Sequence, residues 1–329
     1  MQELPVSVGD LSALLRLELR GCELLANLPS SIDSLTTLTA LELCDCEQLT
    51  ALPNSISQLR ALTSLRLTGC EQLVSLPDSV GDLTALTQLE LRHFNALQTL
   101  PSSIGRLAAL TVLRFYDSIS LESLPDSIGA LAALTTLDLS CNRALTGLPD
   151  SIVNLVTVTN LDLGSCSELA SVPESIGKMT ALAELKLNGC SLLQRLPESI
   201  GELQALELLG LDLCSALTCL PQSIGNMTAL KCLSLSDCTQ LTALPDSIGN
   251  LKSLVLLNLS LCSALSYLPD SMGQLGALER LHLRYCSGLV SLPTTLSQLP
   301  PLQYLDVQRC CELVRRSAAA LVLAPPSGA

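Results

Sequence analysis

The sequence predicts an α/β solenoid, in which one unit of a short helical turn and a short strand is repeated and stacked. The first observation is a proline that recurs every 24 residues, thirteen times, from Pro5 to Pro293. The second is the composition: 48% of the residues are hydrophobic but only 2% are aromatic, so aliphatic side chains must build the core. The third is that two apolar spacings, one helical and one strand-like, coexist in each unit.

Each unit opens with a helical turn, for which residues 53–62 serve as the example. Pro53 ends any preceding helix, because its ring removes a hydrogen bond and clashes with the earlier turn. Ser55 stands where its hydroxyl oxygen could accept hydrogen bonds from free amides, as an N-cap does. Apolar residues then recur at every third position from Ile56 to Leu62. This spacing is typical of a short helix or a 3₁₀ turn.

A strand follows the turn in every unit. Residues 65–67 read Leu-Arg-Leu, the alternation that a strand with one buried face requires. One unit cannot bury its apolar side alone, so stacked units would share a continuous core behind a wall of parallel strands. The thirteen units cover residues 5–316. We therefore expect a single repeat domain over residues 1–316 and a short C-terminal tail, residues 317–329, that is flexible or folds over the last turn.

The full unit has a specific signature. Residues 244–265 read Leu-Pro-Asp-Ser-Ile-Gly-Asn-Leu-x-x-Leu-x-x-Leu-x-Leu-x-x-Cys-x-x-Leu, and the second half is the Cys form of the leucine-rich-repeat consensus. The whole unit resembles the repeat regions of plant intracellular nucleotide-binding (TIR-type) disease-resistance receptors. It is also similar to plant intracellular Ras-group leucine-rich-repeat proteins.

This resemblance implies a leucine-rich-repeat solenoid shaped as a curved horseshoe, with a parallel β-sheet on the concave face and short helical or 3₁₀ segments on the convex face. It also implies a protein partner, bound on the concave face, in intracellular signalling or innate-immune recognition. The sequence holds no Gly-x-x-x-x-Gly-Lys-Ser/Thr phosphate loop. The nucleotide-binding domain of those receptors is therefore absent from it.

The chain has 15 cysteines, and most fall on one repeat position. The resemblance implies that these residues are buried and hydrogen-bond the loop backbone, while a disulfide between neighbours is the alternative. Reduced thiols, and a charged opening segment instead of a signal peptide, indicate a cytoplasmic or nuclear protein that is not secreted. The expected cysteine ladder comprises Cys22, Cys46, Cys70, Cys166, Cys190, Cys214, Cys238, Cys262, Cys286 and Cys310.

Catalytic chemistry finds little support in the sequence. The two histidines, His93 and His282, are eight repeats apart and cannot share a site or a metal. Acidic residues such as Asp78 and Asp246 follow the repeat proline, where they suit the start of a helical turn better than a calcium site. We expect no enzyme activity, no cofactor and no metal. The net charge of −13 argues against nucleic acid, and the longest apolar run, residues 318–324, is too short for membrane insertion.

Side chains at the eleventh, thirteenth and fifteenth places after each proline are expected to face outward from the concave wall. Two zones of this wall are rich in Arg, Tyr and His, residue types that suit a binding site. Between the zones, Leu208, Leu213, Cys232, Leu256 and Leu261 would form an apolar strip if they are exposed. The candidate protein-binding residues are Arg92, His93, Arg114 and Tyr116 in the first zone, and Arg280, His282, Arg284, Tyr285 and Tyr304 in the second.

A plainer interpretation of both zones is drift in a degenerate repeat. The first zone coincides with a break in the cysteine ladder at Phe94, Ser118 and Asn142, and Phe94 could simply fill the core. We expect a monomer that acts as a protein-protein interaction module. Two alternatives stay open: a bacterial effector repeat domain that docks host proteins, which could be the substrate-binding part of a ubiquitin ligase, and a consensus-like scaffold.

Overall fold

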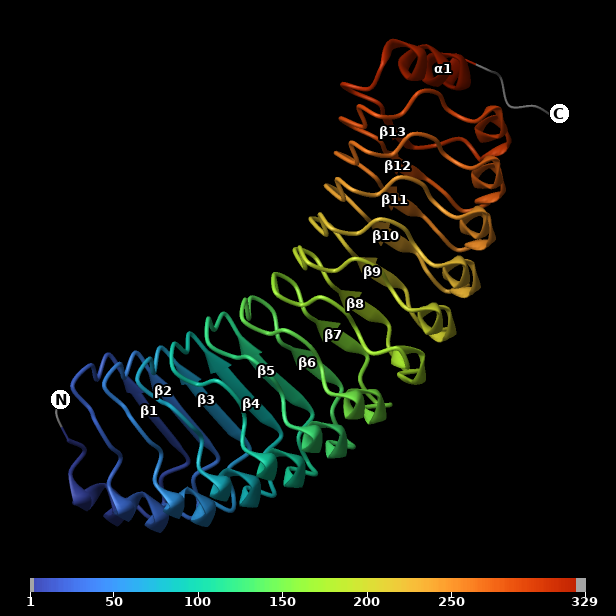
Figure 1. Cartoon of the computed structure of the whole chain (residues 1–329). Helices are drawn as coiled ribbons and strands as arrows, with labels where there is room; N and C mark the ends of the chain where they lie inside the picture. Colours follow the sequence, from blue (N-terminus) through green and yellow to red (C-terminus); the bar gives the residue numbers. More distant parts are fainter. Residues whose placement is uncertain (1–2, 324–329) are drawn as a thin grey trace. The chain divides into compact units, whose positions relative to one another are not determined.

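The computed structural model describes residues 3–323, and the chain divides into two compact units, Met1–Leu161 and Asp162–Ala329. Each unit alternates 3₁₀ turns with short parallel strands. Within each unit the strands line one side and the 3₁₀ turns line the opposite side (Figure 1). Thirteen strands and thirteen 3₁₀ turns alternate over the described residues, one of each per repeat, which confirms the predicted α/β leucine-rich-repeat architecture.

The first unit contains seven turns and six complete strands, and each of these strands pairs in parallel with the next in sequence order. The strand β7 (Asn160–Asp162) lies at the division between the units. The turns are η1 (Val6–Asp10), η2 (Ser30–Ser34), η3 (Asn54–Gln58), η4 (Asp78–Asp82), η5 (Ser102–Arg106), η6 (Asp126–Ala130) and η7 (Asp150–Asn154). The strands are β1 (Arg16–Arg20), β2 (Ala40–Cys44), β3 (Ser64–Thr68), β4 (Gln88–Arg92), β5 (Val112–Tyr116) and β6 (Thr136–Asp138).

The second unit has the same order, with strands of three residues that again pair in parallel with their sequence neighbours. The turns are η8 (Ile176–Lys178), η9 (Glu198–Glu202), η10 (Gln222–Asn226), η11 (Asp246–Asn250), η12 (Asp270–Gln274) and η13 (Thr294–Gln298). The strands are β8 (Glu184–Lys186), β9 (Leu208–Gly210), β10 (Cys232–Ser234), β11 (Leu256–Asn258), β12 (Arg280–His282) and β13 (Tyr304–Asp306).

The core has the aliphatic composition that the sequence predicts. In β3, Leu65 and Leu67 are fully buried while Arg66 is exposed, and Ile56, Leu59 and Leu62 are fully buried in the preceding turn. Only two aromatic side chains, Phe94 and Phe115, are fully buried among the described residues. Layers of equivalent leucines from successive repeats therefore replace the aromatic packing of an ordinary core.

The predicted N-cap role of Ser55 is wrong. The turn η3 begins one residue earlier, at Asn54, and its N-cap position is held by Pro53, with no side-chain capping bond. The tight turn closes because the amide of Ile56 donates to the carbonyl of Pro53 at 3.0 Å, the i→i+3 bond of a 3₁₀ helix. The Ser55 hydroxyl instead donates to the carbonyl of Ser30 in the preceding repeat, at 3.2 Å.

The recurrent glycine four places after the proline is explained by the stacking of the turns. A Cβ atom at Gly201 would lie 2.3 Å from the carbonyl oxygen of Ser223 and 2.7 Å from its Cβ atom, one repeat later. No side chain fits at such a distance. The glycine thus allows neighbouring 3₁₀ turns to approach closely.

The sixteenth place after each proline has a left-handed backbone in all thirteen repeats. Glycine occupies it at Gly21, Gly69 and Gly189. The other ten are L-residues, for which a positive φ is unfavourable: Asp45, His93, Asp117, Cys141, Ser165, Leu213, Asp237, Leu261, Tyr285 and Arg309. This shared conformation could not be predicted from the residue types, because small, charged, apolar and aromatic side chains all occupy this place.

A helix follows the last repeat. Helix α1 (Glu312–Leu323) crosses the boundary expected at residue 316. Residues 317–323 of the expected tail thus belong to a helix, and Ala318 is buried there, as is Val314 just before the tail. Residues 324–329 lie outside the described part of the chain.

Candidate protein-binding face

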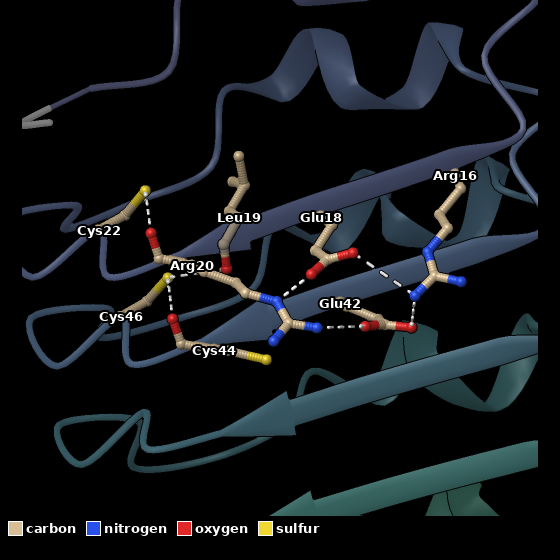
Figure 2. Close-up of polar contacts among 8 residues, drawn as sticks. All are labelled: Arg16, Glu18, Leu19, Arg20, Cys22, Glu42, Cys44 and Cys46. Carbon is tan, nitrogen blue, oxygen red and sulfur yellow. Dashed lines mark hydrogen bonds and ion pairs between the residues drawn. The ribbon is translucent and has the colours of Figure 1, made fainter.

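The strand face is defined here by the side chains at the eleventh, thirteenth and fifteenth places of each repeat. In the first unit many of the charged side chains on this face form ion pairs with one another. Figure 2 shows Arg16 and Arg20 reaching toward Glu42 of the next strand, with N···O distances of 2.7 and 3.8 Å, while Glu18 contacts both arginines. Glu42 is buried beneath them. These charges compensate each other within the protein.

The first predicted zone is connected in the same way. Tyr116 donates its hydroxyl to Glu90 at 3.1 Å, and the Arg92 guanidinium lies 5.4 Å from the centre of the Tyr116 ring. The Asp117 carboxylate lies near the Arg92 guanidinium and the Nδ1 atom of His93, at N···O distances of 3.6 and 3.2 Å. The structure therefore brings three of the four predicted residues, all but Arg114, into one internal network.

Arg114 is exposed on β5, and no ion pair to it occurs within residues 3–319. It lies between Glu90 of β4 and Asp138 of β6 in the register of the sheet. The Asp138 carboxylate is occupied by the amide and hydroxyl of Ser140, at 3.0 and 2.6 Å. Among the described residues, Arg114 is thus the cation of this zone that has no acidic partner.

Beneath this zone, the residues that replace the ladder cysteines pack together in the core. Phe94 is fully buried and meets Phe115 edge to face, with ring centres 6.0 Å apart. The amide of Phe94 donates to the Ser118 hydroxyl at 3.1 Å. Asn142 is fully buried and donates its Nδ2 to the carbonyls of Phe115 and Leu139, at 2.5 and 2.8 Å. These residues hold adjacent repeats together, and none of them reaches the strand face.

The second predicted zone differs in its electrostatics. On β12, Arg280 is exposed and His282 stacks on Tyr304 of β13, with ring centres 4.7 Å apart. Arg284 follows β12 and covers the ring of Tyr285 at 5.1 Å. In the described chain neither Arg280 nor Arg284 has an acidic partner within 4.0 Å. The zone therefore presents two uncompensated guanidinium groups beside aromatic rings.

The residues that were predicted to form an apolar strip between the two zones are exposed or partly exposed. Leu213 is 55% exposed and Leu261 is 42% exposed. Leu208, Cys232 and Leu256 are partly exposed and lie side by side at the start of β9, β10 and β11. Leu213 and Leu261 also hold the left-handed position, a feature that sequence reasoning missed.

The predicted ladder cysteines are buried, and all 15 cysteines are unbridged. From Cys190 to Cys310 each ladder thiol donates to a backbone carbonyl of the preceding repeat, as from Cys214 to Leu187 at 3.1 Å and from Cys310 to Leu283 at 2.9 Å. In the first unit the matching contact lengthens to 4.0 Å for Cys46 and Cys70.

The ladder thiols are poor nucleophiles. Burial raises the pKa of Cys46 to about 11 and that of Cys70 to about 12. In the second unit, burial raises the pKa of Cys214, Cys262 and Cys286 to about 12. Since the thiolate is the reactive form, these residues act as hydrogen-bond donors in the core.

No group of three or more metal-binding side chains is close enough to hold an ion within the described chain. Over the same residues, no helix has the length and apolar character needed to cross a membrane.

The fold and this face define a repeat solenoid with a mixed polar and apolar strand surface. A family model described as a leucine-rich repeat region matches residues 185–264, and a leucine-rich repeat model matches residues 133–155. A leucine-rich repeat protein of Leptospira interrogans is 30% identical, with a TM-score of 0.59, and the match covers 98% of this chain and 91% of that one. This chain belongs to the leucine-rich repeat proteins.

Two further solved structures are similar. The leucine-rich repeat domain of the type III effector XopL is 26% identical, with a TM-score of 0.52, covering 74% of this chain and 76% of that one. Toll in the Drosophila Toll–Spätzle complex is 20% identical, with a TM-score of 0.58, covering 86% of this chain and 45% of that one; this likeness concerns the fold alone. No curated protein sequence matches significantly.

Proposed function

We propose that this chain is a protein-interaction module that binds a protein partner on its strand face and acts by binding, without catalysis. The family generally mediates protein-protein interaction. The observation that carries the proposal is the second zone, where Arg280 and Arg284 stand uncompensated beside Tyr285 and Tyr304. Arg and Tyr dominate binding hot spots, and an unpaired surface charge is free to meet a partner.

The setting we propose is intracellular, in signalling or in innate-immune recognition of the disease-resistance type, with the chain as a monomer in the cytoplasm or nucleus. This setting rests on the resemblance of the repeat to plant intracellular proteins and on the reduced state expected for the thiols. The acidic net charge supports a protein over a nucleic acid as partner.

A second candidate is a bacterial effector repeat domain that docks host proteins. The specific observation in its favour is the 26% identity to the repeat domain of the type III effector XopL. Both candidates use the same binding face and differ in the source of the partner.

The test is affinity capture with the purified full chain, followed by mass spectrometry and by binding measurements on the partner identified. Arg284→Ala combined with Tyr304→Ala should weaken binding about tenfold or more, since hot-spot truncations each cost over 1 kcal/mol. The melting temperature should not fall, because both side chains are exposed. Arg92→Ala with Tyr116→Ala is the matched pair in the first unit, and unchanged binding in both pairs would remove the proposal.

A further inference from the structure

We propose that the strand face from β9 to β13 binds an acidic polypeptide segment, with apolar side chains packed on Leu208, Cys232 and Leu256 and carboxylates paired with Arg280 and Arg284. This inference deepens the proposed function and rests on it. It names the chemistry of the partner, which the fold alone does not.

No neighbouring side chain neutralises either guanidinium group. The Arg280 side chain makes no hydrogen bond or ion pair within residues 3–319, and the Arg284 guanidinium lies over the Tyr285 ring without an ion pair. Two carboxylates stand nearby. Asp306, opposite His282 in the register, accepts the Tyr304 hydroxyl at 3.4 Å and the Gln308 amide at 2.9 Å. Glu279 precedes Arg280 without pairing to it. The guanidinium groups are therefore available to a ligand's carboxylates, the charge-assisted partners that suit Arg best.

The exposed apolar side chains and Arg280 lie in one row across the sheet. Leu208, Cys232, Leu256, Arg280 and Tyr304 are direct neighbours across five consecutive strands. At about 4.8 Å per strand, Leu208 lies about 14 Å from Arg280. An extended peptide that crosses the strands advances about 6.6 Å for every two residues. Two apolar side chains separated by one residue, followed two residues later by Asp or Glu, would match this row.

The side chains at the sixteenth place of these repeats also favour an apolar ligand. Leu213, Leu261 and Tyr285 are 55%, 42% and 39% exposed, and all three have a positive φ. Large apolar side chains are poorly suited to this backbone, and glycine or aspartate takes the position in six of the other repeats. Exposure and an unfavourable backbone together leave Leu213 and Leu261 without a stabilising role in the free protein, whereas a bound apolar segment would give them one.

The experiment selects a displayed library of random twelve-residue peptides against the full chain. We expect enriched peptides to carry two apolar residues separated by one residue. Asp or Glu should stand two residues beyond this pair, on either its N-terminal or its C-terminal side. A synthetic peptide from the most enriched group is then measured by fluorescence anisotropy. Arg280→Glu with Arg284→Glu should weaken its binding about a hundredfold, as loss of two charge pairs at about tenfold each implies.

Arg60→Glu is the matched control, because Arg60 is an exposed cation outside the strand face and has no ion pair among the described residues; it should leave binding within about twofold. Leu261→Asn should weaken binding of the peptide while preserving the fold, since Asn tolerates the left-handed backbone. Enriched peptides without acidic residues, no enrichment, or acidic peptides indifferent to positions 280 and 284 would each overturn this inference. The proposed function fails separately, if the partner protein binds equally well to strand-face variants of both zones.

Discussion

The Sγ atom of Cys214 lies 3.1 Å from the carbonyl oxygen of Leu187, which belongs to the preceding repeat. The contact recurs down the second unit, from Cys190 at 3.3 Å to Cys310 at 2.9 Å. Each thiol thus gives a second donor to a buried carbonyl that already accepts a backbone amide, as the Leu187 carbonyl accepts the amide of Cys190 at 3.1 Å. The ladder cysteines are therefore structural, and their low reactivity follows from their burial.

Thiol reactivity should separate the ladder from the other cysteines. Five cysteines stand outside the ladder and are exposed or half-buried, and we expect these to react with a thiol reagent at pH 8 in the folded protein. The ladder thiols should react only after denaturation, because they are buried in the core, out of reach of the reagent. Burial also raises the pKa of several of them, such as Cys46, Cys70 and Cys214. The total in denaturant without reductant should approach 15. Rapid labelling of the ladder would contradict the structure. The five are Cys44, Cys141, Cys219, Cys232 and Cys311.

Stability should fall in alkali. Burial raises the pKa of Cys214 and Cys262 to about 12 in the folded state, whereas an unfolded cysteine has a pKa near 8.5. A raised pKa gives stability that is complete below pH about 8.5 and is lost as pH rises toward the folded value. Each such thiol should lower the unfolding free energy by up to about 1.4 kcal/mol per pH unit in this window.

The measurement is the urea unfolding midpoint from pH 7 to pH 10 in the presence of reductant. Cys214→Ser is the control, because serine does not titrate there; its midpoint should be lower at pH 7 but decline less steeply. Parallel curves for the two proteins would count against the linkage.

Asn142 should be a critical joint in the first unit. Its Nδ2 donates to the carbonyls of Phe115 and Leu139 in the core, so Asn142→Ala removes two buried hydrogen bonds, one of which joins adjacent repeats. We expect a loss of roughly 2–3 kcal/mol in urea unfolding. Asn142→Cys restores the ladder residue, which elsewhere donates to the same carbonyl of the preceding repeat, and should cost much less. Equal losses for both variants would show that the hydrogen bonds contribute little.

Two glycines of the second unit should respond oppositely to alanine. Gly201→Ala would place a Cβ atom 2.3 Å from the Ser223 carbonyl oxygen, and we expect a loss of roughly 1–3 kcal/mol from overpacking. Gly276→Ala would meet no atom within 4 Å, so it should be neutral or slightly stabilising because it restricts the unfolded chain. Thermal melts of both variants check this, and similar melting temperatures would refute the close packing of the 3₁₀ turns.

Much of this protein could be predicted from its period. The alternation of residues 65–67 identified the buried and exposed sides of the strands, and the ladder cysteines are buried where the repeat places them. The period also implies that residues 24 apart are neighbours, so the Arg66–Glu90 ion pair at 3.0 Å could have been foreseen. The left-handed sixteenth place could not, since Gly, Asp, Leu and Tyr all occupy it.

The sequence by itself determined the repeat, the strand face and the aliphatic core, because burial follows directly from a strict apolar spacing. Only the tertiary structure decided which surface charges are free. Ion pairs such as Arg92–Asp117 join side chains whose approach depends on rotamers and on the turn after the strand. Arg284 occupies the same place of its repeat as Arg92, yet neither its guanidinium group nor that of Arg280 finds an acidic partner in the described chain. The side chains of neighbouring repeats thus leave two unpaired arginines in the second zone and one, Arg114, in the first, a difference that the sequence pattern did not show.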